Sequence, residues 1–292
     1  MINDTAIAVN QLGARAGAIS VTNDIWHKDI FDFLSLQTET GDIRRKSFDI
    51  FPAVSVPDIF MQRVLDNATR TLFDPKEIQE KTGKKLQDMY GPEFENFYKE
   101  LEMNPQLELK EVISAKDLFK TFLKSVVETG MPYMFFRDTV NATNPNKHAG
   151  MVYSTQLCTE ICQNTKPATF IEETAEDDTV SIKYKAGDLV VCNLTSINVA
   201  KVYTPEDTAK VIPVAMRILD NVITLNFFPV QEGRITSEQY RSVGLGFLGL
   251  AEHLATNNMM YDSAFARVHV DELFENYAYH TLKASHTLAK ER

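Results

Sequence analysis

The chain has only three cysteines among its 292 residues, and this scarcity is the first constraint on it. Three cysteines cannot build a disulfide framework, so Cys158, Cys162 and Cys192 each need a separate explanation. The sequence also lacks a run of about 18 apolar residues and a basic-then-apolar segment after Met1, so we expect neither a membrane span nor a secretory signal. These absences favour the cytoplasm, where thiols stay reduced.

Concentrated positive charge is missing as well. The formal net charge is −10, and acidic and basic residues are mixed along the chain, which argues against a nucleic-acid-binding surface. The histidines show no HxxxH or HxH pairing and no nearby Cys or carboxylate at ligand spacing, so we expect no metal site. A hydrophobic content of 44% is ample for a sizeable core. The composition is typical of a globular protein whose partners are proteins and small molecules.

Extended and helical segments alternate along the chain, which predicts α/β architecture. Residues 47–56 are rich in aromatic and β-branched side chains and stop at Pro57, as a buried strand does. Residues 114–129 carry one apolar stripe at helical spacing, with Ser114 as a candidate N-cap and Gly130 as the terminator. We predict a strand and a helix there.

The remaining segments continue this pattern. We predict short extended or polar segments in the middle of the chain: a strand over 132–136, a polar loop over 138–150, and two strands over 179–184 and 188–192 around a turn at 185–187. The final third carries apolar residues at helical intervals, which predicts helices over 237–256 and 263–292.

Gly244, Gly246 and Gly249 spell GxGxxG. A dinucleotide fingerprint needs a strand before the first glycine, whereas residues 240–242 continue a helical start. We therefore interpret these glycines as a site of close helix packing.

The strongest candidate for chemistry is residues 154–164, STQLCTEICQN. Gln156, Cys158 and Glu160 are spaced by two, and on an extended segment such residues project to the same side. A buried cysteine is usually a small hydrophobe, and that alternative stays open. A carboxylate is costly to bury for packing alone, and a buried Glu160 with a raised pKa would suit general acid-base work.

Cys192 lies further along, in VVCNLTSIN, a predicted strand followed by polar residues. Two cysteines from separate strands can cycle between dithiol and disulfide, although core filling explains Cys192 equally simply. Cys162 carries no such support, and we interpret it as structural. The Gly-rich residues 9–17 carry Gln11 and Arg15, which suit a phosphate-contacting or ligand-sensing loop or an ordinary turn.

Several segments together resemble one family, the large catalytic subunit of class I ribonucleotide reductase. TQLCTEI resembles that family's SNLCTEI finger-loop motif, and VVCNLTSIN resembles its VCNLASLN segment. Other blocks are similar to family segments in the same order: INDTAIAVNQLGARAGA, NDIWHKDIFDFLSLQTETGD, VPDIFMQRV, ETGMPYMFFRDTVN, LDNVITLNFFPV, YRSVGLGFLGLAE and LKASHTLAKE. The resemblance implies that residues 1–292 form a single domain, the middle of the family's ten-stranded α/β barrel, with a central finger loop and helices outside.

The resemblance also implies roles for the residues of the finger loop. Cys158 would become a thiyl radical that removes the 3′ hydrogen of the ribose, and Glu160 would act as the base on the 3′ hydroxyl. Gln156 stands where the family has Asn, and the extra methylene should displace the amide that holds the substrate hydroxyl.

Further roles follow from the same resemblance. Cys192 would be one of two cysteines that reduce the 2′ position and end as a disulfide. Gln11 and Arg15 fall in the loop that links the site of the nucleotide effectors, dNTP or ATP, to the substrate base. No cofactor would be bound by this chain, because the radical is supplied by a metal-containing small subunit.

The expected activity is thiyl-radical reduction of ribonucleoside diphosphates to deoxyribonucleoside diphosphates, with a reductant of the thioredoxin or glutaredoxin type. The family's N-terminal cone, its second reducing cysteine, its phosphate loop, its paired tyrosines and its C-terminal cysteine tail have no counterpart here. We therefore expect one piece of a split large subunit, as in some bacteriophages, that needs N-terminal and C-terminal fragments. The alternative is a non-catalytic nucleotide-binding or regulatory remnant of the barrel.

Overall fold

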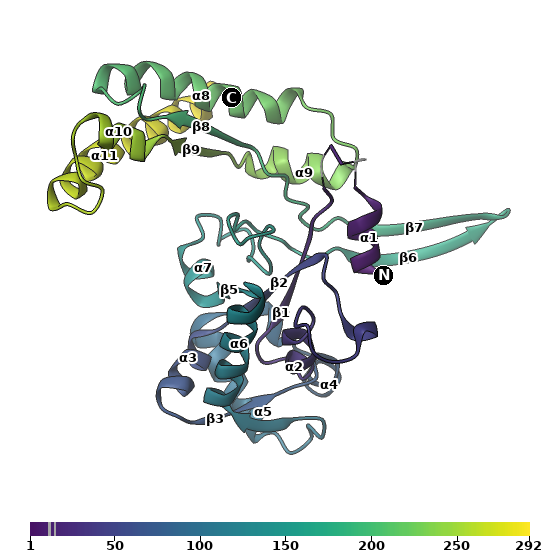
Figure 1. The fold of residues 1–292 in the computed structure, drawn as a ribbon. Coiled ribbons are helices and arrows are strands. Elements are labelled where there is room, and N and C mark those ends of the chain that lie inside the picture. The colour runs from purple at the N-terminus through teal and green to yellow at the C-terminus, as the bar shows by residue number, and fades with distance from the viewer. Residues whose placement is uncertain (11–12, 15) are drawn as a thin grey trace. The chain divides into compact units, whose positions relative to one another are not determined.

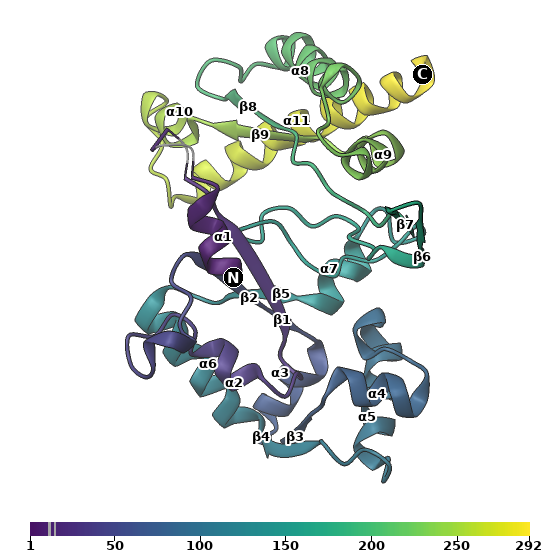
Figure 2. The same ribbon diagram turned by 90° about the vertical axis from the view of Figure 1, so that its right-hand side faces the viewer.

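The structure is a computed structural model that describes residues 1–10, 13–14 and 16–292. The chain divides into two compact units, Met1–Pro167 and Ala168–Arg292. Each unit mixes helices with strands (Figure 1 and Figure 2), so the predicted α/β class is confirmed. The single domain over 1–292 stays a prediction. No helix among the described residues is both long enough and apolar enough to cross a membrane.

The first unit is built around a parallel sheet. Strands β1, β2 and β5 form this sheet with β2 in the centre, in the register Ile19↔Ile50 and Ala53↔Tyr133, and β3 and β4 form a separate antiparallel pair. The elements in chain order are α1 (Ile2–Ala8), β1 (Ile19–Asp24), α2 (Ile30–Leu34), η1 (Ile43–Arg45), β2 (Ile50–Val56), α3 (Asp58–Leu65), β3 (Thr69–Leu72), α4 (Pro75–Thr82), η2 (Leu86–Asp88), α5 (Gly91–Met103), β4 (Glu111–Ser114), α6 (Ala115–Thr129), β5 (Tyr133–Phe136) and α7 (Arg137–Thr143).

Helices α2, α3 and α6 bury the apolar side chains of β2, and Figure 2 shows these three helices next to one another. β2 is buried along nearly its whole length, as its β-branched and aromatic residues predict. The core between these elements includes Val54, Val56, Phe60, Leu118 and Phe122. The predicted strand over 47–56 is therefore confirmed, with a start three residues later.

The helix predicted over 114–129 is confirmed as α6. The Ser114 hydroxyl accepts a hydrogen bond from the backbone N–H of Asp117, which caps the first turn. Gly130 ends the helix in the left-handed conformation, with φ of 77°. The strand predicted over 132–136 is confirmed as β5.

The polar loop predicted over 138–150 is wrong at its start, because α7 occupies Arg137–Thr143. Three polar residues of this helix, Arg137, Asp138 and Asn141, are buried because they satisfy backbone groups of other segments. The carboxylate of Asp138 accepts hydrogen bonds from the N–H groups of Asp58 and Gly91, each at 2.7 Å. The side chain of Asn141 bonds the backbone of Val152. Polarity here marks internal hydrogen bonding rather than a solvated loop.

The second unit contains a long hairpin and a helical layer. The elements are β6 (Thr169–Glu176), β7 (Thr179–Lys185), β8 (Leu194–Asn198), α8 (Pro205–Leu225), α9 (Gln231–Tyr240), β9 (Gly244–Leu248), α10 (Leu250–Thr256) and α11 (Ala264–Glu291). β6 and β7 are antiparallel, and β8 and β9 form a parallel pair against which α8 and α11 pack. The helix predicted over 263–292 is confirmed as α11, with Ser263 as its N-cap.

Two predictions for this unit are wrong. The strand over 179–184 exists as β7, but its partner is β6 across a turn at Asp177 and Asp178, and 188–192 forms no strand. The helix predicted over 237–256 is instead the end of α9, then β9 and α10.

The glycines of the GxGxxG segment explain the second error. Gly244 and Gly246 lie in β9 and permit close approach to β8, since a Cβ on Gly244 would lie 2.2 Å from Cδ2 of Leu194. Gly249 follows with φ of 80°, which favours glycine. The interpretation as close packing holds, but the packed elements are strands and not helices.

The carboxylate of Asp138 joins the start of α3 to the start of α5, and its removal should destabilise the first unit. Asp138→Asn places an NH₂ group against a backbone N–H, so we expect unfolding to become easier by about 2 kcal/mol. Chemical denaturation measures this change. Asp66→Asn, at an exposed carboxylate, is the control with an expected change below about 0.5 kcal/mol. Equal midpoints for the two variants would contradict this role.

Candidate functional site

The segment 151–165 forms a loop whose two arms are tied together at the base. The Asn141 side chain accepts a hydrogen bond from the N–H of Val152 at 2.8 Å and donates one to the carbonyl of Val152 at 3.1 Å. The Thr165 hydroxyl accepts from the N–H of Tyr153 at 2.9 Å, and the N–H of Thr165 donates to the carbonyl of Met151. These bonds hold a loop without regular secondary structure in one place.

The tip of this loop is a tight turn and not the extended segment predicted for 154–164. The N–H of Gln156 donates to the carbonyl of Ile161 at 3.1 Å, and the N–H of Thr159 donates to the carbonyl of Gln156 at 2.7 Å. Thr159 adopts the left-handed conformation, with φ of 65°. The spacing argument for a shared face was therefore wrong in its geometry, because a turn and not a strand places the side chains.

The turn nevertheless brings Cys158 and Glu160 together. The carboxylate of Glu160 accepts a hydrogen bond from the backbone N–H of Cys158 at 2.7 Å. Both side chains are exposed, so the expectation of a buried carboxylate is wrong for the chain by itself. The backbone bond places a thiol and a carboxylate on one exposed tip, and these two groups are suited to hydrogen or proton transfer.

A third side chain, missed in the sequence, joins this pair. The hydroxyl of Tyr133 donates a hydrogen bond to the sulfur of Cys158 at 3.5 Å. This bond raises the pKa of Tyr133, with further contributions from burial and from the charges of Cys158 and Glu160. The signal available in the sequence was a hydroxyl at the start of the predicted strand 132–136, but only the fold shows which loop it faces.

The other residues of the tip play different parts. The side chain of Gln156 is exposed, and its backbone closes the turn. Cys162 is exposed as well, with its sulfur 3.8 Å from the carbonyl oxygen of Thr159. Partial desolvation of the thiol by its neighbours raises the pKa of Cys162, and the charge of Glu160 acts in the same direction.

Cys192 lies in the second unit, between β7 and β8, and is half-buried. Its pairing with another cysteine stays a prediction. Gln11 and Arg15 lie outside the described residues. Among the described residues, no group of three or more His, Cys, Asp or Glu is arranged to hold a metal ion.

A pocket of about 620 Å³ adjoins the arm that leads to the tip. It is lined by hydroxyl-bearing and aliphatic side chains from α1, β1 and the loop: Ile2, Thr5, Ile19, Ser20, Val21, Thr22, Tyr153, Ser154 and Thr155. Burial, together with the charge and hydrogen bond of Asp88, raises the pKa of Tyr153 to about 12. Because none of these described residues is charged, the pocket suits a neutral polar group such as a sugar or a nucleobase.

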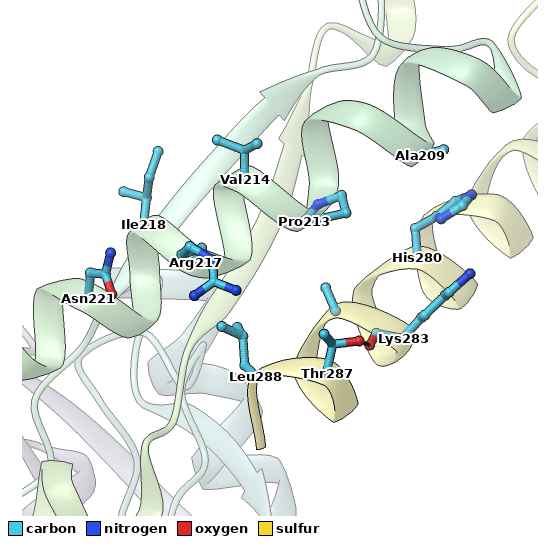
Figure 3. A pocket seen from close by; sticks show the side chains of 11 residues that line it. Ala209, Pro213, Val214, Arg217, Ile218, Asn221, His280, Lys283, Thr287 and Leu288 are labelled. Atoms are coloured by element: carbon cyan, nitrogen blue, oxygen red, sulfur yellow. Dashed lines mark hydrogen bonds between the residues drawn. The ribbon is translucent and has the colours of Figure 1, made fainter. Parts of the chain in front are cut away.

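A second hollow lies between α8 and α11 and has a volume of about 420 Å³ (Figure 3). Its floor is apolar, and Arg217, His280 and Lys283 stand along it. Arg217 is paired with Glu291 at 2.5 Å. The described residues that line this groove include no thiol and no carboxylate, so it does not compete with the loop 151–165 as a reaction site.

The family model described as "Ribonucleotide reductase, barrel domain" matches residues 1–292. A ribonucleoside-diphosphate reductase subunit alpha of Helicobacter pylori is 41% identical over 327 residues, which cover 99% of this chain and 41% of that protein. The subunit alpha of a Synechocystis species is 42% identical over 294 residues, which cover 100% of this chain and 36% of that protein.

A plant protein extends the comparison. The ribonucleoside-diphosphate reductase large subunit of Arabidopsis thaliana is 34% identical over 302 residues, with 99% of this chain and 35% of that protein covered. The chain thus spans less than half of the length of the curated relatives it matches. By its match to the barrel domain and by these relatives, the chain belongs to the family of ribonucleotide reductase large subunits.

Proposed function

We propose that the chain carries the thiyl-radical centre of a ribonucleoside-diphosphate reductase, as one piece of a split large subunit. The observation that carries this proposal is the contact between Cys158 and Glu160 on the tip of the loop 151–165. The bond places a thiol and a carboxylate on the same tip, and these are the groups that hydrogen-atom and proton removal from one ribose requires. The relatives in Helicobacter pylori and Synechocystis are ribonucleoside-diphosphate reductase subunits, which supports the same reaction.

The reaction balances with these groups. A radical in the small subunit removes the hydrogen of the Cys158 thiol, and the thiyl sulfur then takes the hydrogen from C3′, so that an S–H bond forms and a C–H bond breaks. Glu160 accepts the proton of the 3′ hydroxyl and later returns it. Two further thiols become a disulfide and supply two electrons and two protons: one proton leaves with the 2′ hydroxyl as water, and the other, with the two electrons, forms the new C2′–H bond. Cys158 returns its hydrogen to C3′, and the small subunit then returns a hydrogen to the Cys158 sulfur and regains its radical.

Cys192 is the proposed member of the reducing pair in this chain, and its partner thiol would come from another fragment. A thioredoxin-type or glutaredoxin-type reductant would restore the two thiols. Gln11 and Arg15 are proposed to connect a dNTP or ATP effector with the substrate base. The pocket beside Tyr153 is the proposed place for the neutral part of the substrate, because hydroxyls line it and no described lining residue is charged.

The need for complementary fragments has a physical basis. Cys158 and Glu160 are exposed, whereas radical chemistry needs a site from which water is excluded. The parallel pair β8–β9 and the edges of β1 and β5 have no further strand beside them among the described residues, although parallel sheets are normally covered and continued. α8 also presents Val214 and Ile218, which are 58% and 57% exposed.

We propose that the missing fragments cover these edges and close the loop, and that the chain alone is inactive. Interruption of a large-subunit gene, as the resemblance implies for some bacteriophages, would produce such a piece. The site of action would be the cytoplasm, where thiols stay reduced.

Substitution of Cys158 tests the radical role. Co-expression with N-terminal and C-terminal large-subunit fragments and a small subunit should produce reduction of ribonucleoside diphosphates. Cys158→Ser should lower the rate at least about 1,000-fold, because a hydroxyl gives up its hydrogen atom far less readily than a thiol. Cys162→Ser is the matched control in the same turn and should retain the rate. Retained activity in Cys158→Ser would end the mechanistic proposal.

Gln156 offers a second test. Restoring the shorter amide by Gln156→Asn should raise kcat/KM about 10-fold or more, because one methylene displaces a group that positions the substrate. The measurement is steady-state reduction by the assembled fragments. An equal or lower value would show that the longer amide is not a handicap. Nucleotide binding without turnover in both proteins would favour the alternative, a regulatory remnant of the barrel.

A further inference from the structure

The sulfur of Cys158 is in contact with a regular strand. Tyr133, whose hydroxyl donates the hydrogen bond at 3.5 Å, is the first residue of β5. β5 pairs with the buried central strand β2, in the register Ala53↔Tyr133. The donor therefore belongs to the three-stranded parallel sheet, whereas the acceptor belongs to a turn without regular structure.

The other hydrogen bonds described for the tip are internal to it. They join the backbone of Gln156 to that of Ile161 and of Thr159, the N–H of Cys158 to Glu160, and the Thr159 hydroxyl and the Cys162 thiol to the carbonyls of Cys158 and Thr159. The ties at Asn141 and Thr165 reach only the base of the loop. Among the hydrogen bonds described for residues 156–162, the one from Tyr133 is the link between the tip and the sheet. Groups on strands are held more precisely than groups on loops.

The direction of this bond has a chemical consequence. A phenol that donates to a lone pair of the sulfur leaves the S–H bond directed elsewhere, because the thiol cannot place its own hydrogen at the same point. The hydrogen bond to Cys158, burial and the nearby negative charges raise the pKa of Tyr133. Tyr133 therefore remains a protonated donor well above neutral pH.

We propose that Tyr133 is the positioning residue for the Cys158 sulfur, with a sheet-anchored hydroxyl that holds the thiol in one orientation and aims its hydrogen away from the sheet. The reaction assigned to the sulfur rests on the proposed function, whereas the contact between Tyr133 and Cys158 does not. In a hydrogen transfer, misplacement of the reacting atom by about 1 Å can cost about 100-fold in rate. A fixed sulfur on an exposed turn meets that requirement.

Tyr133→Phe tests the proposal, because it removes the hydroxyl and keeps the ring. The measurement is the rate at which iodoacetamide alkylates each cysteine of the 292-residue chain as a function of pH, with the peptides separated by mass spectrometry. We expect alkylation of Cys158 at neutral pH to slow about three- to tenfold, and its pH profile to move upward, because the thiolate loses a hydrogen-bond donor. The profiles of Cys162 and Cys192 should stay unchanged.

Tyr279→Phe, at an exposed tyrosine of the second unit, is the matched control and should leave the Cys158 profile unchanged. If Tyr133→Phe yields too little folded protein, 3-fluorotyrosine at position 133 replaces it. Its more acidic phenol donates more strongly and should speed alkylation at neutral pH. A Cys158 profile that superimposes on the wild type in the folded variant would overturn the proposal.

The assay separates this proposal from the proposed function, because alkylation needs no partner fragment and no turnover. A displaced Cys158 profile without any reductase activity in the assembled fragments would overturn the proposed function and support the role of Tyr133. Reductase activity in the assembled fragments, together with an unchanged Cys158 profile in Tyr133→Phe, would support the proposed function and overturn the role of Tyr133.

Discussion

The hydrogen bond from the Cys158 backbone N–H to the Glu160 carboxylate is the interaction on which the candidate site depends. It folds the acid back onto the thiol residue, so that two reactive groups share the tip of one turn. The left-handed conformation of Thr159, between them, makes this return possible. In an extended segment, the thiol and the carboxylate would share only one face of the chain. No hydrogen bond would then fix the position of one residue relative to the other.

The turn is useful only because its surroundings are rigid. The base of the loop is tied through Asn141 and Thr165, and Asp138 joins the neighbouring helix α7 to the starts of α3 and α5. Buried polar groups with satisfied hydrogen bonds specify one arrangement of the backbone. The same unit leaves Cys158 exposed, and the strands β1, β5, β8 and β9 leave edges free among the described residues. The proposed function therefore requires further polypeptide beside the edges of each unit, because radical chemistry needs a site without water.

Local signals explain which elements were predictable. α6 followed from its cap, its apolar stripe and its terminal glycine, because all three act within one helix. The prediction of one helix over 237–256 was wrong because Gly244 and Gly246 pack against β8, a strand that lies far earlier in the chain. The prediction of a loop from residue 138 was wrong because the polar side chains of Asp138 and Asn141 form hydrogen bonds with backbone groups of other segments. Both wrong predictions have the same cause: contacts between residues far apart in the sequence decide the structure of these segments.

The sequence by itself determined the α/β class, the family resemblance and the choice of Cys158 and Glu160, because motifs and hydrophobic spacing are properties of neighbouring residues. Only the tertiary structure decided that the tip is a turn, that the carboxylate is exposed, and that Tyr133 reaches the sulfur. The reason is physical, since 25 residues separate Tyr133 from Cys158, and the pairing of β5 with β2 carries the hydroxyl to the loop.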